Sequence, residues 1–393
     1  MSIRIGIVGA GIGGLAAGAF LAQEGHNVTV FDQFKMPQPV GSGLVIQPVG
    51  LAVLDRIGAG NQARNSGNRI RRMLGHESDT KAPVLDVWYD RDGTGESFGL
   101  GIHRSALFEA VSEAAVAAGA HLIAAHKAAG LARRHITFEN QERRGPFDLI
   151  VDASGAGGGL SPMKARALPY GAIWGTVPWP ATELPQDRLT QSYRRADRMI
   201  GVLPCGTLPG SDVPQAAIFW SMPRGGHRDW RRNPLEDWKA EATALWPDFA
   251  PFLETITQHD QMTMARYSHG TLRKPFGDHL AIIGDSAHKA SPQLGQGANM
   301  ALLDAMALSE ALRFEPDIPT ALLHYARARR WHVWIYQAMS WAFTPQYQSD
   351  SKWLPVLRDR VLFPVSQIQP LPRVLTRLVC GNMIPPLGSL TPR

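Results

Sequence analysis

Three glycines near the amino terminus have the spacing of a phosphate-binding turn. Gly9, Gly11 and Gly14 fit the pattern G-x-G-x-x-G. In this pattern the first glycine allows a tight turn, the second lets the backbone approach a diphosphate, and the third lets a helix pack closely on a sheet. Asp32 follows about 20 residues later, where a carboxylate accepts hydrogen bonds from ribose hydroxyls and disfavours a 2′-phosphate. The spacing therefore predicts a dinucleotide site.

The elements around these glycines agree with that interpretation. The apolar run 3–8 is typical of a buried parallel strand, residues 13–24 have helical spacing, and residues 27–32 are typical of the next strand. Together they form a strand–helix–strand unit in which the glycines stand at the turn from strand to helix. Because FAD and NAD both bind such units, this motif alone leaves the cofactor open.

A second glycine-rich segment lies at residues 282–299. Gly284 and Asp285 end a short apolar run that predicts a strand, and a long helix is expected over 297–312. Free N–H groups and the positive end of a helix dipole can stabilise an anionic ring by about 0.3 to 2 kcal/mol. The start of this helix is formed by Gly295, Gly297, Ala298 and Asn299.

With Gly284-Asp285 and the run Pro292-Gln293-Leu294-Gly295-Gln296-Gly297-Ala298-Asn299 in register, the sequence resembles the flavoprotein aromatic hydroxylases. This family includes para-hydroxybenzoate, salicylate and 6-hydroxynicotinate monooxygenases. The resemblance implies that FAD is the bound cofactor. It also implies that Asp285 binds the ribityl chain and that Pro292 lies near the flavin face.

Two further stretches extend the resemblance. Residues 41–48, which include Gly43, look like the family's glycine loop beside the isoalloxazine ring. Ile102-His103-Arg104 looks like the family's arginine motif, so Arg104 would meet the diphosphate, where a planar guanidinium can bind two oxygens. The matches run from residue 3 to about residue 310 and miss mainly the middle of the chain. They are specific for the family and not for the substrate.

The resemblance implies an FAD-dependent monooxygenase that uses NADH or NADPH and O2 to hydroxylate a small aromatic or heteroaromatic substrate through a flavin C4a-hydroperoxide. Because the flavin carries this chemistry, the protein need supply only binding, orientation and exclusion of water. A general base for a phenol-like substrate stays open among His103, Tyr193 and His288. A hydrogen-bonded structural role is the simpler interpretation of His288.

One position departs from the family pattern. The run Val151-Asp152-Ala153-Ser154-Gly155 places Ser154 where the family usually has an aspartate. That aspartate is associated with the handling of both FAD and NAD(P)H. The sequence has no second G-x-G-x-x-G unit at a strand-to-helix turn, so we expect NAD(P)H to bind transiently and to reduce the flavin slowly until substrate binds. The missing aspartate should lower the substrate-free rate further, and a Ser154→Asp variant should be reduced faster.

The substrate pocket is expected between the flavin and the middle of the chain, mainly apolar with a few polar groups. For each aromatic candidate taken individually, an ordinary core position is the favoured interpretation. The candidates are Gln47, Trp174, Tyr193, Phe219, Trp220 and Pro292.

These elements predict an α/β fold: a Rossmann-like FAD-binding domain with an inserted β-sheet substrate domain and a helical C-terminal region. The FAD-binding domain would take residues 1–170, with a sheet excursion near 71–100, and resume at 276–335. The substrate lobe would take residues 171–275, which contain short β-like runs rich in Trp and Pro. The helical C-terminal region would take residues 336–393.

Composition excludes other classes of protein. Cys205 and Cys380 lie far apart and fit no metal-ligand spacing, so we expect no metal and a reducing cytoplasm. The net charge of +6 is dispersed, so no nucleic acid partner is expected. Glycines interrupt the apolar start of the chain, which argues against a signal sequence, and no other stretch reaches the ~20 apolar residues of a spanning helix.

Two alternative functions stay open. A flavin dehydrogenase or reductase could act on an apolar, isoprenoid-like substrate, and membrane contact through the C-terminal region would support it. There Val374, Leu375, Leu378 and Val379 could form one face and Arg373 and Arg377 another, although packing against the body of the protein is simpler. A flavin-bound sensor without catalysis is the other alternative. The partners expected are a small aromatic substrate, O2 and NAD(P)H, and the assembly a monomer or homodimer.

Overall fold

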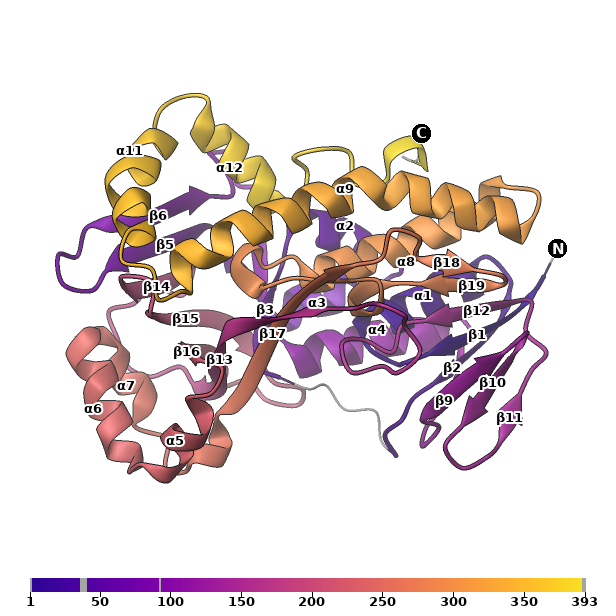
Figure 1. Ribbon diagram of the computed structural model, residues 1–393, viewed down its shortest axis with the longest axis horizontal. Coiled ribbons are helices and arrows are strands. Elements are labelled where there is room, and N and C mark those ends of the chain that lie inside the picture. Colours follow the sequence, from indigo (N-terminus) through magenta and orange to yellow (C-terminus); the bar gives the residue numbers. More distant parts are fainter. Residues whose placement is uncertain (1, 36–40, 92, 391–393) are drawn as a thin grey trace.

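The computed structural model describes residues 2–35, 41–91 and 93–390. Two large sheets lie at opposite ends of the molecule, and a long helix runs from one to the other (Figure 1). The predicted α/β class, with a Rossmann-like region, a sheet domain and a helical C-terminal region, is confirmed.

The first sheet has six strands, and all of its pairings except the β18–β19 edge are parallel. Its central strands are buried on both faces, which is why they consist of continuous apolar runs. In order, the strands are β18 (Phe276–Gly277), β19 (Leu280–Ile282), β12 (Leu149–Asp152), β1 (Arg4–Val8), β2 (Asn27–Phe31) and β8 (His121–Ile123).

Three helices complete this half of the molecule. α1 (Ile12–Gln23) packs against both α4 (Arg104–Ala117) and α8 (Gly297–Phe314), and one apolar core joins them to the sheet. The carboxyl ends of the parallel strands therefore meet at one edge, where ligands bind in open α/β sheets. A small separate sheet, β9 (Ala128–Ala132), β10 (His135–Phe138) and β11 (Arg143–Arg144), lies beyond the strands of this half (Figure 1).

The second large sheet has eight strands drawn from distant parts of the chain. Its neighbours pair antiparallel, except β14 and β5, which pair in parallel. In order, the strands are β20 (His288–Lys289), β17 (Thr263–Thr271), β13 (Arg166–Pro178), β16 (Pro214–Pro223), β15 (Arg198–Thr207), β14 (Arg188–Arg194), β5 (Arg72–Glu77) and β6 (Pro83–Trp88).

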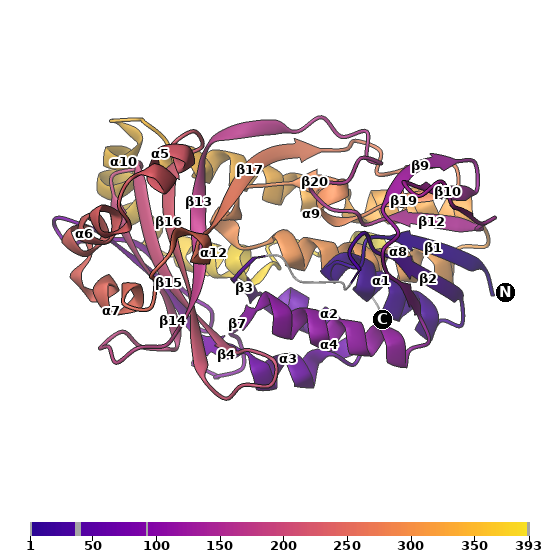
Figure 2. The same ribbon diagram turned by 90° about the horizontal axis from the view of Figure 1, so that it is seen from below.

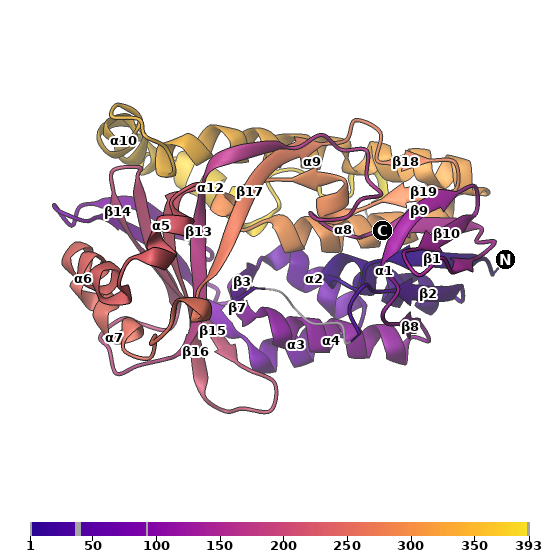
Figure 3. The ribbon, with the colours of Figure 1, turned by 60° about the horizontal axis from the view of Figure 1, so that its bottom comes forward.

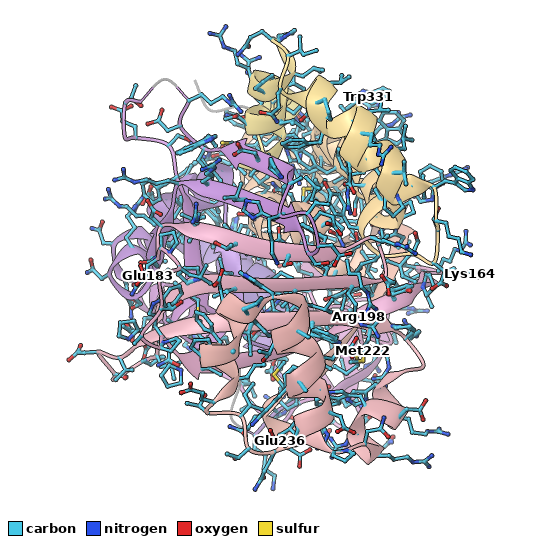
Figure 4. All side chains as sticks on the ribbon, turned by 90° about the vertical axis from the view of Figure 1, so that its left-hand side faces the viewer. Lys164, Glu183, Arg198, Met222, Glu236 and Trp331 are labelled. Carbon is cyan, nitrogen blue, oxygen red and sulfur yellow. The ribbon has the colours of Figure 1, made fainter. Side chains whose placement is uncertain are left out.

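The two faces of this sheet have different neighbours. On the outer face an aromatic core joins the sheet to α5 (His227–Arg232), α6 (Leu235–Leu245) and α7 (Ala250–Leu253), and Figure 4 shows helices in front of the strands on that side. The inner face packs toward the FAD half and the C-terminal helices. Because successive side chains of a strand point to opposite faces, each strand contributes to both cores.

A three-stranded sheet joins the two halves. Its strands lie between the inner face of the large sheet and the helices α2 (Pro48–Arg56) and α3 (Gly60–Ser66) (Figure 2), and Figure 3 shows the same arrangement. In order, they are β3 (Gly43–Ile46), β7 (Gly99–His103) and β4 (Asn68–Ile70).

The C-terminal region is helical. α9 (Ile318–Tyr347) is 30 residues long and passes position 335 without a break. The short helices α10 (Leu354–Leu357) and α11 (Phe363–Ser366) precede α12 (Leu371–Cys380). In the part of the chain that the structure describes, no helix combines the length and apolarity needed to cross a bilayer.

Candidate cofactor and substrate site

A cavity of about 570 Å³ opens at the carboxyl ends of β1, β2, β12 and β19. Its lining comes largely from the glycine loops that follow these strands and from the start of α8. Of the predicted cofactor residues, it brings together Gly9, Gly11, Asp32, Arg104, Gly284, Asp285, Gly297 and Ala298.

The three glycines of the first motif have different surroundings. A Cβ on Gly9, whose φ is +101°, would lie 2.5 Å from the carbonyl oxygen of Ala153, and a Cβ on Gly14 would clash with the carbonyl oxygen of Gly9. A Cβ on Gly11 would meet nothing within 4 Å. Gly9 and Gly14 are therefore required for packing, whereas Gly11 borders open space. Gly11 is also the N-cap of α1 and offers no side-chain cap, so the free N–H groups there suit a phosphate.

This difference leads to a test. Gly11→Trp should fold, because the φ of −77° at Gly11 suits any residue, but its side chain should fill the groove and sharply reduce FAD retention. Gly14→Ala should instead destabilise the apoprotein by about 1–3 kcal/mol, as overpacking does. Thermal unfolding of the apoproteins and flavin absorbance after purification measure the two effects. Wild-type FAD content in Gly11→Trp would contradict the assignment.

Asp32 stands at the end of β2 and lines the cavity. Its carboxylate accepts hydrogen bonds from the backbone N–H of Ala10 and of Phe34, both at 2.9 Å. A carboxylate has roughly four acceptor positions, so about two stay free for ribose hydroxyls. Asp32 thus holds the glycine turn and can still bind a ribose.

Arg104, the first residue of α4, brings a positive charge to the wall of the cavity. Its side chain lines the cavity, and burial lowers the pKa of the guanidinium although Asp285 and Tyr267 lie near enough to raise it. Among the described residues the guanidinium has no hydrogen-bond or ion-pair partner. Because an enclosed charge without a partner is costly, a bound anion such as a diphosphate is the partner that fits.

Asp285 lies opposite, in the short 3-10 turn Gly284–Ser286 after β19. It is open to the cavity and otherwise enclosed by protein, and this burial raises the pKa of its carboxyl, against His288, Arg104 and Lys289. Asp32 and Asp285 thus place one carboxylate on each side of a basic, glycine-lined groove. This arrangement fits a molecule in which a diphosphate lies between two sets of hydroxyl groups. The residues present therefore fit FAD.

The predicted flavin end is built from two loops that one side chain joins. Asn299 is fully buried, its amide donates to the carbonyl oxygens of Val45 (3.3 Å) and Gly295 (2.9 Å), and its Oδ1 accepts from Gln47 N–H (2.8 Å). Its side chain therefore positions the loops and is not free for a ligand. Gly43 is also a packing residue, since a Cβ there would lie 2.8 Å from the Cβ atoms of Ala217 and Cys205.

A buried charge network supports the Gly284 turn. The carboxylate of Asp304, on α8, accepts from Gly284 N–H (2.9 Å), His288 Nε2 (2.6 Å) and Arg329 Nε (2.7 Å). Burial alone would raise the pKa of this carboxyl, but His288 and Arg329 hold it below its usual range. Asp304 therefore connects the cofactor turn to α9.

The same network reaches the end of the chain. Arg329 donates to the carbonyl oxygen of Pro386 at 2.5 Å, and His332 Nε2 lies 2.8 Å from the carbonyl oxygen of Gly381. Burial, with Arg329 nearby, lowers the pKa of His332 to about 3, so its ring is neutral at pH 7. Its Nε2–H then donates to Gly381, and Nδ1 accepts from Arg329 at 3.3 Å.

The neutral His332 predicts a pH dependence. Between pH 3 and about 6.5 the unfolded chain binds a proton that folded His332 does not, so stability falls as the pH is lowered, by up to ~1.4 kcal/mol per pH unit. His332→Gln should remove this contribution and flatten the profile. Urea unfolding at pH 7, 6 and 5 measures the slope, and the exposed His121→Gln is the control. Equal slopes in wild type and His332→Gln would refute this account.

The three candidate bases all have structural partners. His103 caps α4 through Ser105 N–H (3.2 Å), and its Nε2 lies 3.2 Å from Thr176 Oγ1. His288 is paired with Asp304, as its structural interpretation expected. Tyr193 is 1% exposed, donates to Gln191 Oε1 at 2.9 Å, and its ring lies at a tilt beside that of Tyr347, with ring centroids 5.2 Å apart. None of the three is among the residues that line the cavity.

The predicted pocket wall is only partly assembled. Trp174 and Phe219 face inward with ring centroids 4.5 Å apart, toward the FAD half. Trp220 faces outward and packs on Trp238 in the core on the outer face of the large sheet, so its assignment to the pocket wall is wrong. Trp220 follows Phe219 directly, and adjacent residues of a strand point to opposite faces. Gln47 is fully buried, and Pro292 is half-buried at the turn before α8.

Sequence reasoning missed Tyr267. Its hydroxyl accepts from Trp174 Nε1 at 2.8 Å, and it lies close enough to Arg104 to raise that residue's pKa. It therefore stands between the sheet and the cofactor groove. No motif marks it, because its position depends on the pairing of β17 with β13.

The Ser154 position also differs from expectation. Its Oγ donates to Asp152 Oδ1 at 2.5 Å, and Ser286 Oγ donates to the same oxygen at 3.2 Å. A carboxylate is thus retained two residues earlier, but it is 1% exposed, whereas Ser154 lines the cavity. The pattern Asp-x-Ser at the end of a strand is the feature of the sequence that could have indicated this hydrogen bond between Ser154 and Asp152.

Comparison with known proteins agrees with this site. An FAD binding domain family matches residues 173–336, and an NAD(P)-binding Rossmann-like domain family matches residues 7–35. Kynurenine 3-monooxygenase from Salinispora tropica is 27% identical over 98% of this chain and 87% of its own length.

Solved structures share the whole fold. The tetrameric form of 2-methyl-3-hydroxypyridine-5-carboxylic acid oxygenase has a TM-score of 0.79 at 20% identity, over 96% of each chain. HpxO from Klebsiella pneumoniae, solved with FAD, has a TM-score of 0.78 at 18% identity, over 96% of this chain and 99% of its own. Over nearly its whole length this chain resembles the FAD-dependent aromatic hydroxylases, and it is an FAD-dependent monooxygenase.

Proposed function

We propose that this monooxygenase hydroxylates a small aromatic or heteroaromatic ring that carries amino, hydroxyl or carboxylate groups, using NAD(P)H and O2. The observation that carries the proposal is the convergence of an unpaired enclosed arginine, an open glycine turn and two helix starts on one groove. Relatives are named for kynurenine and for 2-methyl-3-hydroxypyridine-5-carboxylic acid, ring compounds with such groups. The relatives do not favour a dehydrogenase acting on an isoprenoid-like substrate.

Within the groove we assign roles by the chemistry of each group. Arg104 and the backbone at Gly11 would bind the diphosphate, Asp32 the ribose, Asp285 the ribityl chain, and the uncapped start of α8 the flavin's pyrimidine edge. FAD supplies the redox chemistry when bound. The residues of the chain then orient the ring and exclude water.

The substrate would lie between the flavin end of the groove and the inner face of the large sheet. Trp174, Phe219 and Tyr267 would contribute its wall, with Pro292 on the cofactor side. The Tyr267 hydroxyl already accepts from Trp174, so its own proton is available to an acceptor on the substrate. We infer a monomer or homodimer, which light scattering would decide.

The buried Asp152 changes what a substitution at Ser154 should do. Ser154→Asp alone would place a second carboxylate beside the first, so repulsion should offset any gain in reduction by NAD(P)H. Asp152→Asn with Ser154→Asp moves the charge to the cavity instead. This double variant should be reduced about tenfold faster than Ser154→Asp, as expected for one hydrogen bond worth ~1.4 kcal/mol. Anaerobic stopped-flow absorbance checks this, and equal rates would exclude a role for position 154.

The proposed activity can be tested directly. The holoenzyme would be given NADH or NADPH with kynurenine, anthranilate or a hydroxypyridine carboxylate, and O2 uptake and products would be followed. A supporting result is a product that gains one oxygen atom from ¹⁸O2. NAD(P)H consumption that yields only hydrogen peroxide, with every aromatic unchanged, would overturn the proposal.

A further inference from the structure

The outer side of the C-terminal helices exposes several tryptophans. Trp331 and Trp334 are each 59% exposed, Trp341 is 69% exposed and Trp353 is 82% exposed. Figure 4 shows Trp331 beside a C-terminal helix, above the strands of the large sheet in that view. Contiguous exposed apolar surface of this kind marks an interaction site in a folded protein.

Three of these tryptophans share one face of α9. Trp331, Trp334 and Trp341 recur at helical spacing together with Arg327 and Arg330, and we call this set the tryptophan face. The rings of Trp331 and Trp334 meet edge to face at 5.8 Å, and the guanidinium of Arg330 lies 5.4 Å from the Trp331 ring. The opposite face of α9 is buried and includes Tyr325, Arg329, His332 and Tyr336.

Exposed apolar side chains also follow α9 in the chain. Trp353 precedes α10, which packs against the end of α9, and the segment from α10 to α11 exposes further aliphatic side chains. These are Val356, Leu357, Val361, Leu362, Val365 and Ile368, each between 38% and 62% exposed. The segment that follows the tryptophan face in the chain is therefore also rich in exposed apolar side chains.

Charge identifies the partner. Between residues 323 and 377 the exposed charges are Arg327, Arg330, Lys352, Arg360, Arg373, Arg377 and a single acid, Asp350. Asp359, which is half-buried, is paired with Arg358. A second copy of the chain would bring these like charges together across a twofold axis, which is unfavourable. An anionic surface complements them.

We propose that the tryptophan face docks on an anionic phospholipid surface. Tryptophan rings are favoured at the headgroup level of a bilayer, and arginine binds lipid phosphates while its stem contacts apolar surface. Since no described helix could span a bilayer, this is contact in the plane of the interface. The apolar face that the sequence predicts on α12 is less suited to this role, because Leu378 and Val379 are buried against the body, Leu375 is half-buried, and of the four residues only Val374 is exposed.

Flotation of the holoenzyme with lipid vesicles tests the proposal. Vesicles of phosphatidylcholine alone would be compared with vesicles that also contain phosphatidylglycerol, at low and high salt. Wild type should bind the anionic vesicles and be released by salt. Arg327→Gln/Arg330→Gln should weaken binding about thirtyfold, since each basic group contributes about fivefold near such a surface.

A second variant tests the tryptophans. Trp331→Ser/Trp334→Ser/Trp341→Ser should bind anionic vesicles at least about tenfold more weakly, from the apolar area removed. The control, Val116→Ser/Val213→Ser, removes side chains that are 56% and 51% exposed elsewhere and should bind like wild type. Because all these residues lie outside the cavity, FAD content should be unchanged in every variant and reports on folding.

Three results would overturn the proposal. The first is no binding of wild type to anionic vesicles, and the second is an equal loss in the control variant. The third is a wild-type dimer that the tryptophan variant converts to monomer in light scattering, because a second copy would then be the occupant.

Discussion

Replacing Arg104 with methionine is expected to stabilise the apoprotein and to remove most of its affinity for FAD. The two effects have opposite signs because the guanidinium is enclosed, has a pKa lowered by burial, and finds no partner among the described residues. Methionine keeps the length of the side chain without the charge. Relief of an unpaired, enclosed charge should raise the free energy of unfolding of the apoprotein by about 1–3 kcal/mol.

The loss of FAD affinity should be larger than that gain. Two charge-assisted hydrogen bonds to a diphosphate contribute about 1.5–3 kcal/mol each, so their loss corresponds to roughly 10²-fold or more in affinity. Apoprotein melting and titration with FAD measure the two effects separately. Arg64→Met is the control, because Arg64 pairs with the exposed Asp55 outside the cavity. If Arg104→Met lowers apoprotein stability along with FAD affinity, Arg104 is a structural residue.

The cofactor half was predictable because its signals are local. Gly9 and Gly11 lie in the turn after β1 and Gly14 lies at the start of α1, so the strand, the turn and the helix are continuous in sequence. Arg104 and Asp285 were found through short motifs next to strand ends, and both line the cavity. The glycines were placed by the local pattern of strand, turn and helix, whereas Arg104 and Asp285 were placed by the resemblance of their short motifs to those of the family.

The substrate half was less predictable because side chains alternate between the two faces of a strand, and this alternation decides which of them face the cofactor. β16 is buried on both faces, so its sequence has no alternation of polar and apolar residues. Phe219 and Trp220 are therefore indistinguishable in sequence, although only Phe219 faces inward. Tyr267 is placed by strand pairing with β13 and has no local signal.

The buried network was missed for a different reason. Charged residues on helices are usually solvated, so the sequence does not distinguish Asp304 and Arg329 from surface charges by any motif. The signals were an aspartate inside the otherwise apolar run of α8, and an arginine and histidine three residues apart on α9. Only the packing of α8 against α9 brings these groups together with Gly284.

This network leads to the largest expected loss of stability. Asp304→Ala should lower the free energy of unfolding by about 3–5 kcal/mol, because it leaves Arg329 buried without its carboxylate partner and removes the acceptor of Gly284 N–H. FAD affinity should fall as well, since Gly284 and Asp285 form the turn that lines the cavity. Urea unfolding of the apoprotein and FAD titration measure both.

A double variant separates the charge from the packing. Asp304→Ala/Arg329→Met removes both charges, so it should be more stable than Asp304→Ala although it lacks one more polar group. The pH dependence gives a second check. The pKa of Asp304 is lowered in the fold, so its stabilisation is present above the unfolded pKa of about 3.9 and is lost as the pH falls through the lower folded value. The stability difference between wild type and Asp304→Ala should therefore not shrink between pH 7 and about 5, and should shrink only in stronger acid. A double variant less stable than Asp304→Ala, or a difference that already shrinks between pH 7 and 6, would mean that the carboxylate does not act through the charge of Arg329.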